Sequence, residues 1–75
     1  LKVLYIEGNG INKIEGFENN LKLRCLYLQE NVISKIENLH FLKDLRILNL
    51  DDNCLTTIEN LSELPLLETL QVKRN

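Results

Sequence analysis

Carboxylates recur at one place in three similar five-residue segments, KIEGF at 13–17, KIENL at 35–39 and TIENL at 57–61. The segments carry Glu15, Glu37 and Glu59, which are 22 residues apart. Evenly spaced carboxylates can act as general acids and bases, or they can hold a cation. They can equally belong to one scaffold element that is repeated three times. The residues around them decide between these alternatives.

Few other side chains of the 75 residues could take part in catalysis or metal binding. The chain has two cysteines, Cys25 and Cys54, which do not form a C-x-x-C pair. With a single histidine, His40, it has too few ligands for an ordinary Cys/His zinc site. It has no glycine-rich phosphate loop and no serine-nucleophile motif. We therefore predict a protein that is not an enzyme and has no metal or other cofactor. Unpaired cysteines favour a reducing compartment, the cytoplasm or the nucleus.

The bulk composition narrows the classes of partner. Apolar residues make up 44% of the chain and charged residues 27%, which is typical of a globular protein. The formal net charge of −2 gives no reason to expect nucleic acid, which binds basic surfaces. No apolar run reaches the roughly 18–20 residues of a membrane-spanning helix. We expect protein partners, and no nucleic acid, membrane or small-molecule substrate.

A 22-residue register organises the whole chain. Its pattern, L-x-x-L-x-L-x-x-N-x-L/I, occurs as LKVLYIEGNGI, LRCLYLQENVI and LRILNLDDNCL, so that Leu1, Leu23, Leu45 and Leu67 form one column. Asn20 interrupts one apolar column, and a one-residue shift would let Leu21 take its place. We predict three full repeats, 1–22, 23–44 and 45–66, and the start of a fourth at 67–75. Because the chain begins without Met and stops inside a repeat, we expect a segment whose capping repeats are missing.

Each repeat is expected to contain a strand and a short helix. Alternating apolar residues in the first half predict a short strand. In the second half Leu39, Leu42 and Leu45 are three apart, which predicts a short helix or 3-10 turn, with Asn38 and Asn60 as N-caps and Gly16 as a weaker one. The predicted fold class is therefore α/β: a right-handed solenoid with parallel strands on the concave face and helices or turns on the convex face.

The asparagine and glutamate columns fit this scaffold. A buried amide can satisfy backbone donors and acceptors where the chain leaves the strand, so we predict a structural ladder of Asn9, Asn31, Asn53 and Asn75. Four surface asparagines that mark functional turns are the alternative. We read the glutamate column as carboxylates at the positive ends of helices, with a cation site as the alternative.

The candidate partner-binding surface is the concave strand face. It has a central set of Val3, Tyr5, Cys25, Tyr27, Ile47, Asn49 and Gln71. The charged rim has basic residues at Lys2, Arg24 and Arg46 and acidic ones at Glu7, Glu30, Asp51 and Asp52. Tyrosine and aliphatic side chains inside a charged border are typical of interface centres.

Three other readings of this face stay open. Aromatic and β-branched residues suit any strand, so their presence does not require a partner. The rim charges could pair with one another across the sheet. Cys25 could be a redox-sensitive thiol or a small packed apolar residue.

The 22-residue period with IENL before the expected helix resembles the short intracellular leucine-rich repeats of protein phosphatase 1 regulators. This family includes a spliceosomal ribonucleoprotein subunit and an outer-arm dynein light chain. Within it, LYLQENVISKIENLHFLKDLRILNLDDN and TIENLSELPLLETLQVKRN are similar to factors that preassemble axonemal dynein arms.

The resemblance implies an interaction scaffold of the cytoplasm, associated with the cilium or flagellum, whose partners are dynein chains or assembly chaperones. A module that binds protein phosphatase 1 or another multiprotein complex is the alternative. In a second class of function, these repeats would be an accessory domain of an enzyme or a nucleic-acid binder.

Overall fold

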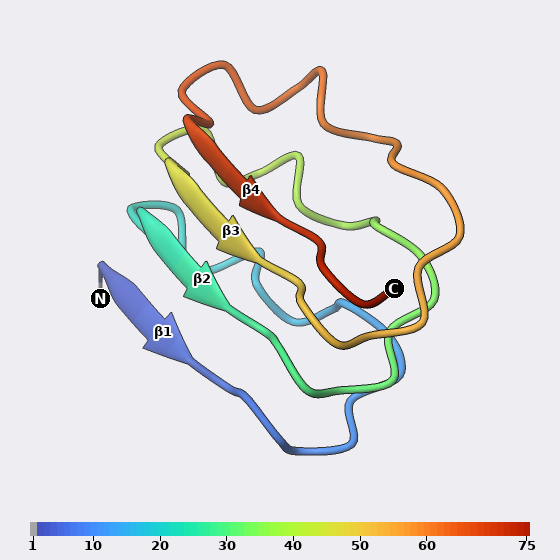
Figure 1. The fold of residues 1–75 in the computed structure, drawn as a ribbon. Helices are drawn as coiled ribbons and strands as arrows, with labels where there is room; N and C mark the ends of the chain where they lie inside the picture. The colour runs from blue at the N-terminus through green and yellow to red at the C-terminus, as the bar shows by residue number, and fades with distance from the viewer. Residues whose placement is uncertain (1) are drawn as a thin grey trace.

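Four short parallel strands are the regular secondary structure of residues 2–75, the part of the chain that the computed structural model describes. They are β1 (Val3–Tyr5), β2 (Cys25–Tyr27), β3 (Ile47–Asn49) and β4 (Thr69–Gln71), in the order β1-β2-β3-β4. Each strand pairs with the next at an offset of 22 residues, for example Leu4 with Leu26. Leu1, the head of the expected leucine column, lies outside the described residues. The chain thus adds one strand per repeat, as Figure 1 shows.

The core lies between this sheet and the segments that connect the strands (Figure 1). The middle residue of each strand points inward, and the middle residues of β2 and β3 are fully buried. The buried apolar residues are Ile14, Phe17, Leu23, Leu26, Leu28, Ile33, Ile36, Leu39, Leu42, Leu45, Leu48, Leu50, Leu55 and Leu64.

Burial is deepest in the second repeat, since it has a neighbour on each side. Ile36 is fully buried there, whereas Ile58, at the same place in the third repeat, is 53% exposed. In the described chain, the fourth repeat consists only of β4 and the residues next to it, so no segment covers Ile58.

The connecting segments contain no helix in residues 2–75, so of the two expected forms, a short helix or a 3-10 turn, the helix is wrong, and with it the α component of the fold class. Each segment instead makes two tandem turns with hydrogen bonds between residues three apart. In the second repeat, Leu42 N donates to Leu39 O at 3.0 Å and Leu45 N to Leu42 O at 3.1 Å. The three-residue apolar spacing thus corresponds to turns. Since helix nucleation is unfavourable, so short a segment gains more from packing each apolar residue than from a single helical turn.

The first repeat makes the same turns. Asn20 N donates to Phe17 O at 2.9 Å, and Leu23 N donates to Asn20 O at 3.0 Å. Leu21 is exposed, so it does not replace Asn20 in the apolar column and the expected one-residue shift does not occur.

The predicted N-caps are wrong as well. Asn38 and Asn60 have φ of 60° and 61°, and Gly16 has φ of 86°, whereas an N-cap residue has extended backbone. Their role is to reverse the chain in the left-handed conformation, which asparagine and glycine tolerate best. Asn38 Nδ2 donates to Ile14 O at 2.8 Å, and Asn60 Nδ2 donates to Ile36 O. These two asparagines therefore link successive repeats through their side chains, a second set of contacts that the repeat pattern did not reveal.

Candidate functional site

Asparagines at the ends of the strands hold the turns that position the sheet. Asn31 is 5% exposed, and its Oδ1 accepts hydrogen bonds from the backbone nitrogens of Asn9 at 3.0 Å and Ile11 at 2.9 Å. Its Nδ2 donates to the carbonyl oxygens of Ile6, Leu28 and Gln29 at 2.9–3.2 Å. One amide thus satisfies backbone groups of two repeats.

The same arrangement recurs along the chain. Asn53 accepts from Ile33 N and donates to Leu28 O at 2.9 Å, the same carbonyl oxygen that Asn31 reaches. Asn75 likewise donates to Leu50 O, which Asn53 also contacts. The side chain of Asn9 makes one bond, to Glu7 O at 3.1 Å, and is exposed. Because neighbouring amides share carbonyl acceptors, Asn31, Asn53 and Asn75 form a continuous structural ladder, which Asn9 joins through its backbone nitrogen.

The side chains that flank the middle residue of each strand form a solvent-facing surface, which we call the outer sheet face. Tyr5 on this face is 64% exposed and stacks on Tyr27 of the neighbouring strand. The ring centroids are 4.6 Å apart and the ring planes differ by 6°. Desolvation raises the pKa of Tyr27 above its usual 10, and the neighbouring Cys25 and Tyr5 contribute in the same direction. The two rings stack face to face across β1 and β2 and form a compact aromatic pair on this surface.

The remaining central residues differ in how accessible they are. Val3 is exposed, and Cys25 and Ile47 are half-buried between neighbouring strands. Cys25 forms no disulfide. Asn49 is buried and its Oδ1 accepts a hydrogen bond from Asp51 N at 3.0 Å, so it supports the turn after β3. Gln71 is exposed at the end of β4. The apolar and aromatic part of the face therefore lies on β1, β2 and the start of β3.

The rim of the face is sharply bent after each strand. Gly8, Glu30, Asp52 and Arg74 occupy the same place in successive repeats, and all have φ between 55° and 68°. Left-handed backbone is unfavourable for residues other than glycine, so these positions are held by the surrounding structure. The repeat pattern of the sequence did not indicate this conformation.

Two of the rim residues pair with residues of the fourth repeat. Arg46 Nη1 lies 3.2 Å from Glu68 Oε2. Arg74 contacts Asp52 through two nitrogens, and its Nη2 lies 3.0 Å from Asp52 Oδ2. The hydrogen bonds from Arg74 hold the pKa of Asp52 below its usual value. Charge pairing across the sheet, one of the open alternatives, therefore occurs between the third and fourth repeats.

Asp51, the next rim residue, also serves the scaffold, since its Oδ1 accepts a hydrogen bond from Lys73 N at 2.7 Å. Glu68 and Arg74 were not among the candidate site residues. The signal that could have found them is the 22-residue offset, which sets Glu68 opposite Arg46 and Arg74 opposite Asp52 with opposite charge.

The rim residues of the first two repeats are different. Lys2, Arg24, Glu7 and Glu30 are exposed, and none belongs to an ion pair among residues 2–75. The side chain of Glu30 extends toward the first repeat. If Gly8 were replaced by a residue with a Cβ atom, that atom would lie 4.0 Å from Glu30 Oε1.

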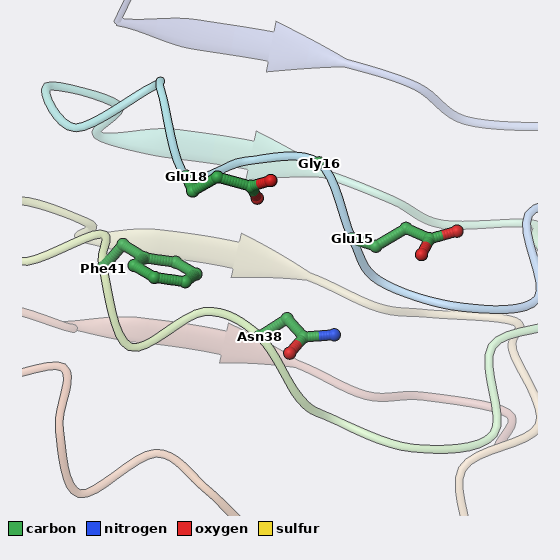
Figure 2. A pocket seen from close by; sticks show the side chains of 5 residues that line it. All are labelled: Glu15, Gly16, Glu18, Asn38 and Phe41. Atoms are coloured by element: carbon green, nitrogen blue, oxygen red, sulfur yellow. The ribbon is translucent and has the colours of Figure 1, made fainter.

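The recurring glutamates lie on the other side of the molecule, among the connecting segments. Glu15 is exposed beside an open hollow of about 540 Å³ between the first and second repeats. Figure 2 shows Glu15 and Glu18 on one side of this hollow and Asn38 and Phe41 on the other. Since the described chain has no helix there, the reading of Glu15 and its counterparts as helix-end carboxylates is wrong.

Residues 2–75 contain neither a cluster of metal-binding side chains nor a membrane-spanning helix. In residues 2–75, no three or more His, Cys, Asp or Glu side chains lie together so that they could hold a metal ion. No helix in this part of the chain is long and apolar enough to cross a membrane.

Comparison with known proteins identifies the repeats. A family model described as leucine-rich repeats (2 copies) matches residues 21–63, which is more than half of the chain. The search of curated proteins found no match. The matched region spans β2, β3 and the segments around them, where the ladder and the parallel sheet are most complete. The chain therefore belongs to the leucine-rich repeat family.

Proposed function

We propose that this chain is a protein–protein interaction scaffold that binds its partner on the outer sheet face. The observation that carries the proposal is the stacked pair of exposed Tyr5 and half-buried Tyr27, on a sheet held by hydrogen-bonded asparagines. Leucine-rich repeats generally mediate protein–protein contacts and are typically not enzymes. A rigid aromatic surface gives large contact area at little conformational cost.

The proposed process is the cytoplasmic assembly of axonemal dynein arms for cilia or flagella. Its support is the resemblance of residues 26–53 and 57–75 to axonemal dynein assembly factor 1. The partners would then be dynein chains or assembly chaperones. Binding of protein phosphatase 1 or of another multiprotein complex is the second candidate, since the 22-residue period with its IENL segment resembles the repeats of regulators of that phosphatase.

Affinity capture from ciliated cells, followed by mass spectrometry, tests both parts of this proposal. We expect dynein heavy or intermediate chains together with chaperones on the wild-type protein, and their loss when Tyr5→Ala and Tyr27→Ala are combined. A phosphatase catalytic subunit in place of dynein chains would favour the second candidate.

A matched control variant distinguishes removal of the binding surface from unfolding of the protein. Leu21→Ala and Leu66→Ala together remove two exposed apolar side chains from the connecting segments, away from the sheet. This variant should recover the same partners as the wild type. If the tyrosine variant keeps its circular dichroism spectrum and still recovers them, the outer sheet face is not the binding surface.

A further inference from the structure

We propose that the docking site is confined to the first two repeats and Ile47, and that it fits a single protein segment with an apolar centre, acidic residues at one end and basic residues at the other. This inference rests on the proposed function, because it describes the same face. It adds where on the face the partner lies, what chemistry it presents and how it is oriented along the strands.

The charges of the rim divide the face into two halves. Over β3 and β4, Arg46 is paired with Glu68, and Asp52 is paired with Arg74. A partner that contacted these groups would gain little, since each charge already has a neutralising neighbour. In the first two repeats, none of Lys2, Arg24, Glu7 and Glu30 has an ion-pair partner among residues 2–75, and the charge of Arg74 acts on Glu30 only at longer range. Charges available to a partner are therefore concentrated there.

The central residues divide the face in the same way. The stacked tyrosines, with Val3 and Cys25 beside them, give β1 and β2 an apolar and aromatic surface that Ile47 extends. Beyond Ile47 the outward side chains are polar, with Asn49 occupied by the turn after β3. The two divisions coincide, although one concerns charge and the other apolar surface. Their agreement sets the boundary of the docking site.

The polarity of the partner follows from the direction of the strands. Lys2 and Arg24 precede β1 and β2, and Glu7 and Glu30 follow them, so one end of the site is basic and the other acidic. Glu7 lies five residue steps after Lys2, which corresponds to about 17 Å of extended chain. A bound segment therefore places acidic groups over Lys2 and Arg24 and basic groups about 17 Å away. That distance is roughly 11 residues of helix or five residues of extended chain.

The spacing of the charges favours a single segment of another protein as the occupant. One helix of roughly 11 residues, or an extended chain of about five residues, places its two charged ends over the basic and the acidic end of the docking site. A second copy of this chain is the competing occupant, because the same face turned by 180° also matches the charges.

Synthetic peptides of about 15 residues test the proposal directly. The first has a Leu and Phe centre with Glu at one end and Lys at the other, the second has Glu at both ends, and the third has Lys at both ends. A fourth keeps the dipolar ends but has an alanine centre. We expect the dipolar peptide to bind the protein about tenfold more tightly than each of the other three. In the second and third peptides one mismatched end replaces attraction by repulsion, and the alanine centre of the fourth loses apolar contact with the tyrosines. Binding is measured by fluorescence anisotropy at low ionic strength, where exposed charges are least screened.

Charge-reversal variants give a result that a change in folding could not imitate. Lys2→Glu with Arg24→Glu makes both ends of the site acidic, so the preferred peptide should change from the dipolar one to the one with Lys at both ends. The control exchanges the paired charges of the third and fourth repeats, Arg46→Glu with Glu68→Arg, and should leave the preference unchanged. Both variants keep the strand residues intact.

Several outcomes would overturn the inference. Equal binding of the peptides, or no binding of the dipolar one, would remove the charge pattern as the basis of recognition. If the variant Arg46→Glu with Glu68→Arg preferred a different peptide, the partner would lie on the half of the face formed by the third and fourth repeats, which contradicts the proposal. A dimer of the protein in light scattering that is lost with Tyr5→Ala and Tyr27→Ala would identify a second copy as the occupant. None of these results depends on which proteins are captured from cells, so the proposed function can fail or hold separately.

Discussion

Replacement of Asn31 by alanine tests how far the ladder stabilises the fold. The side chain is buried and makes five hydrogen bonds, two accepted by Oδ1 and three donated by Nδ2. Each protein hydrogen bond contributes about 1 kcal/mol, and a buried group left without a partner costs about 1–3 kcal/mol. Water can reach the part-buried partners, so not every bond counts fully. We expect Asn31→Ala to lower the free energy of unfolding by about 3–4 kcal/mol.

The other ladder members provide a graded series. Asn53 makes four such bonds, Asn75 makes three, and the side chain of Asn9 makes one at the surface. The destabilisation should therefore fall in the order Asn31, Asn53, Asn75 and Asn9, the last below about 0.5 kcal/mol. Because Asn31 and Asn53 share Leu28 O, their double variant should not be additive.

The assay is equilibrium urea unfolding followed by far-ultraviolet circular dichroism. A chain of this size is expected to have a total stability of roughly 4–11 kcal/mol, so the loss at Asn31 should be a large part of it. The midpoint should shift without a change in the urea dependence, since the variants alter stability and not the exposed surface. Equal destabilisation by Asn31→Ala and Asn9→Ala would refute the reasoning, because the two differ in burial and in the number of bonds.

Three further predictions concern the second set of asparagines and the titratable groups. Asn38→Ala should destabilise the protein by about 1–2 kcal/mol in the same urea assay, and more than Asn38→Gly, because alanine is strained at positive φ while both lose one hydrogen bond. Asp52, whose pKa is lowered by Arg74, contributes stability that is present above its ordinary pKa of 3.8 and is lost as pH falls through its folded pKa. In Asp52→Asn, the free energy of unfolding should therefore fall less steeply as the pH is lowered into the acidic range. An unchanged pH dependence would contradict the pairing of Asp52 with Arg74. Ultraviolet titration should show Tyr27 ionising above pH 10, and Tyr5→Ala should bring its pKa closer to that value; no change would argue against the stacked arrangement.

The second half of each repeat shows why sequence-based prediction failed in part. Leu39, Leu42 and Leu45 are all buried, but their spacing in the sequence suits both a helix and tandem turns. The choice depends on Asn38, whose amide reaches the carbonyl oxygen of Ile14 in the preceding repeat. A local pattern does not contain that contact.

The candidate site was predictable in outline and not in detail. The 22-residue offset brought Tyr5 and Tyr27 to neighbouring strands, and the structure shows that their rings stack. Whether Arg46 is available to a partner depends on the position of Glu68, and whether Asn49 is available depends on the turn after β3. Residue type alone does not distinguish paired from unpaired rim charges.

The sequence by itself determined the period, the strand positions and the inward column of leucines, because a repeated apolar pattern can be buried in one register only. The family of the chain follows from the same pattern. Only the tertiary structure decided that the connecting segments form turns, that Asn38 and Asn60 are left-handed, and that Ile36 is buried while Ile58 is exposed. These features depend on contacts between residues about one repeat apart, and each repeat acquires them from its neighbours.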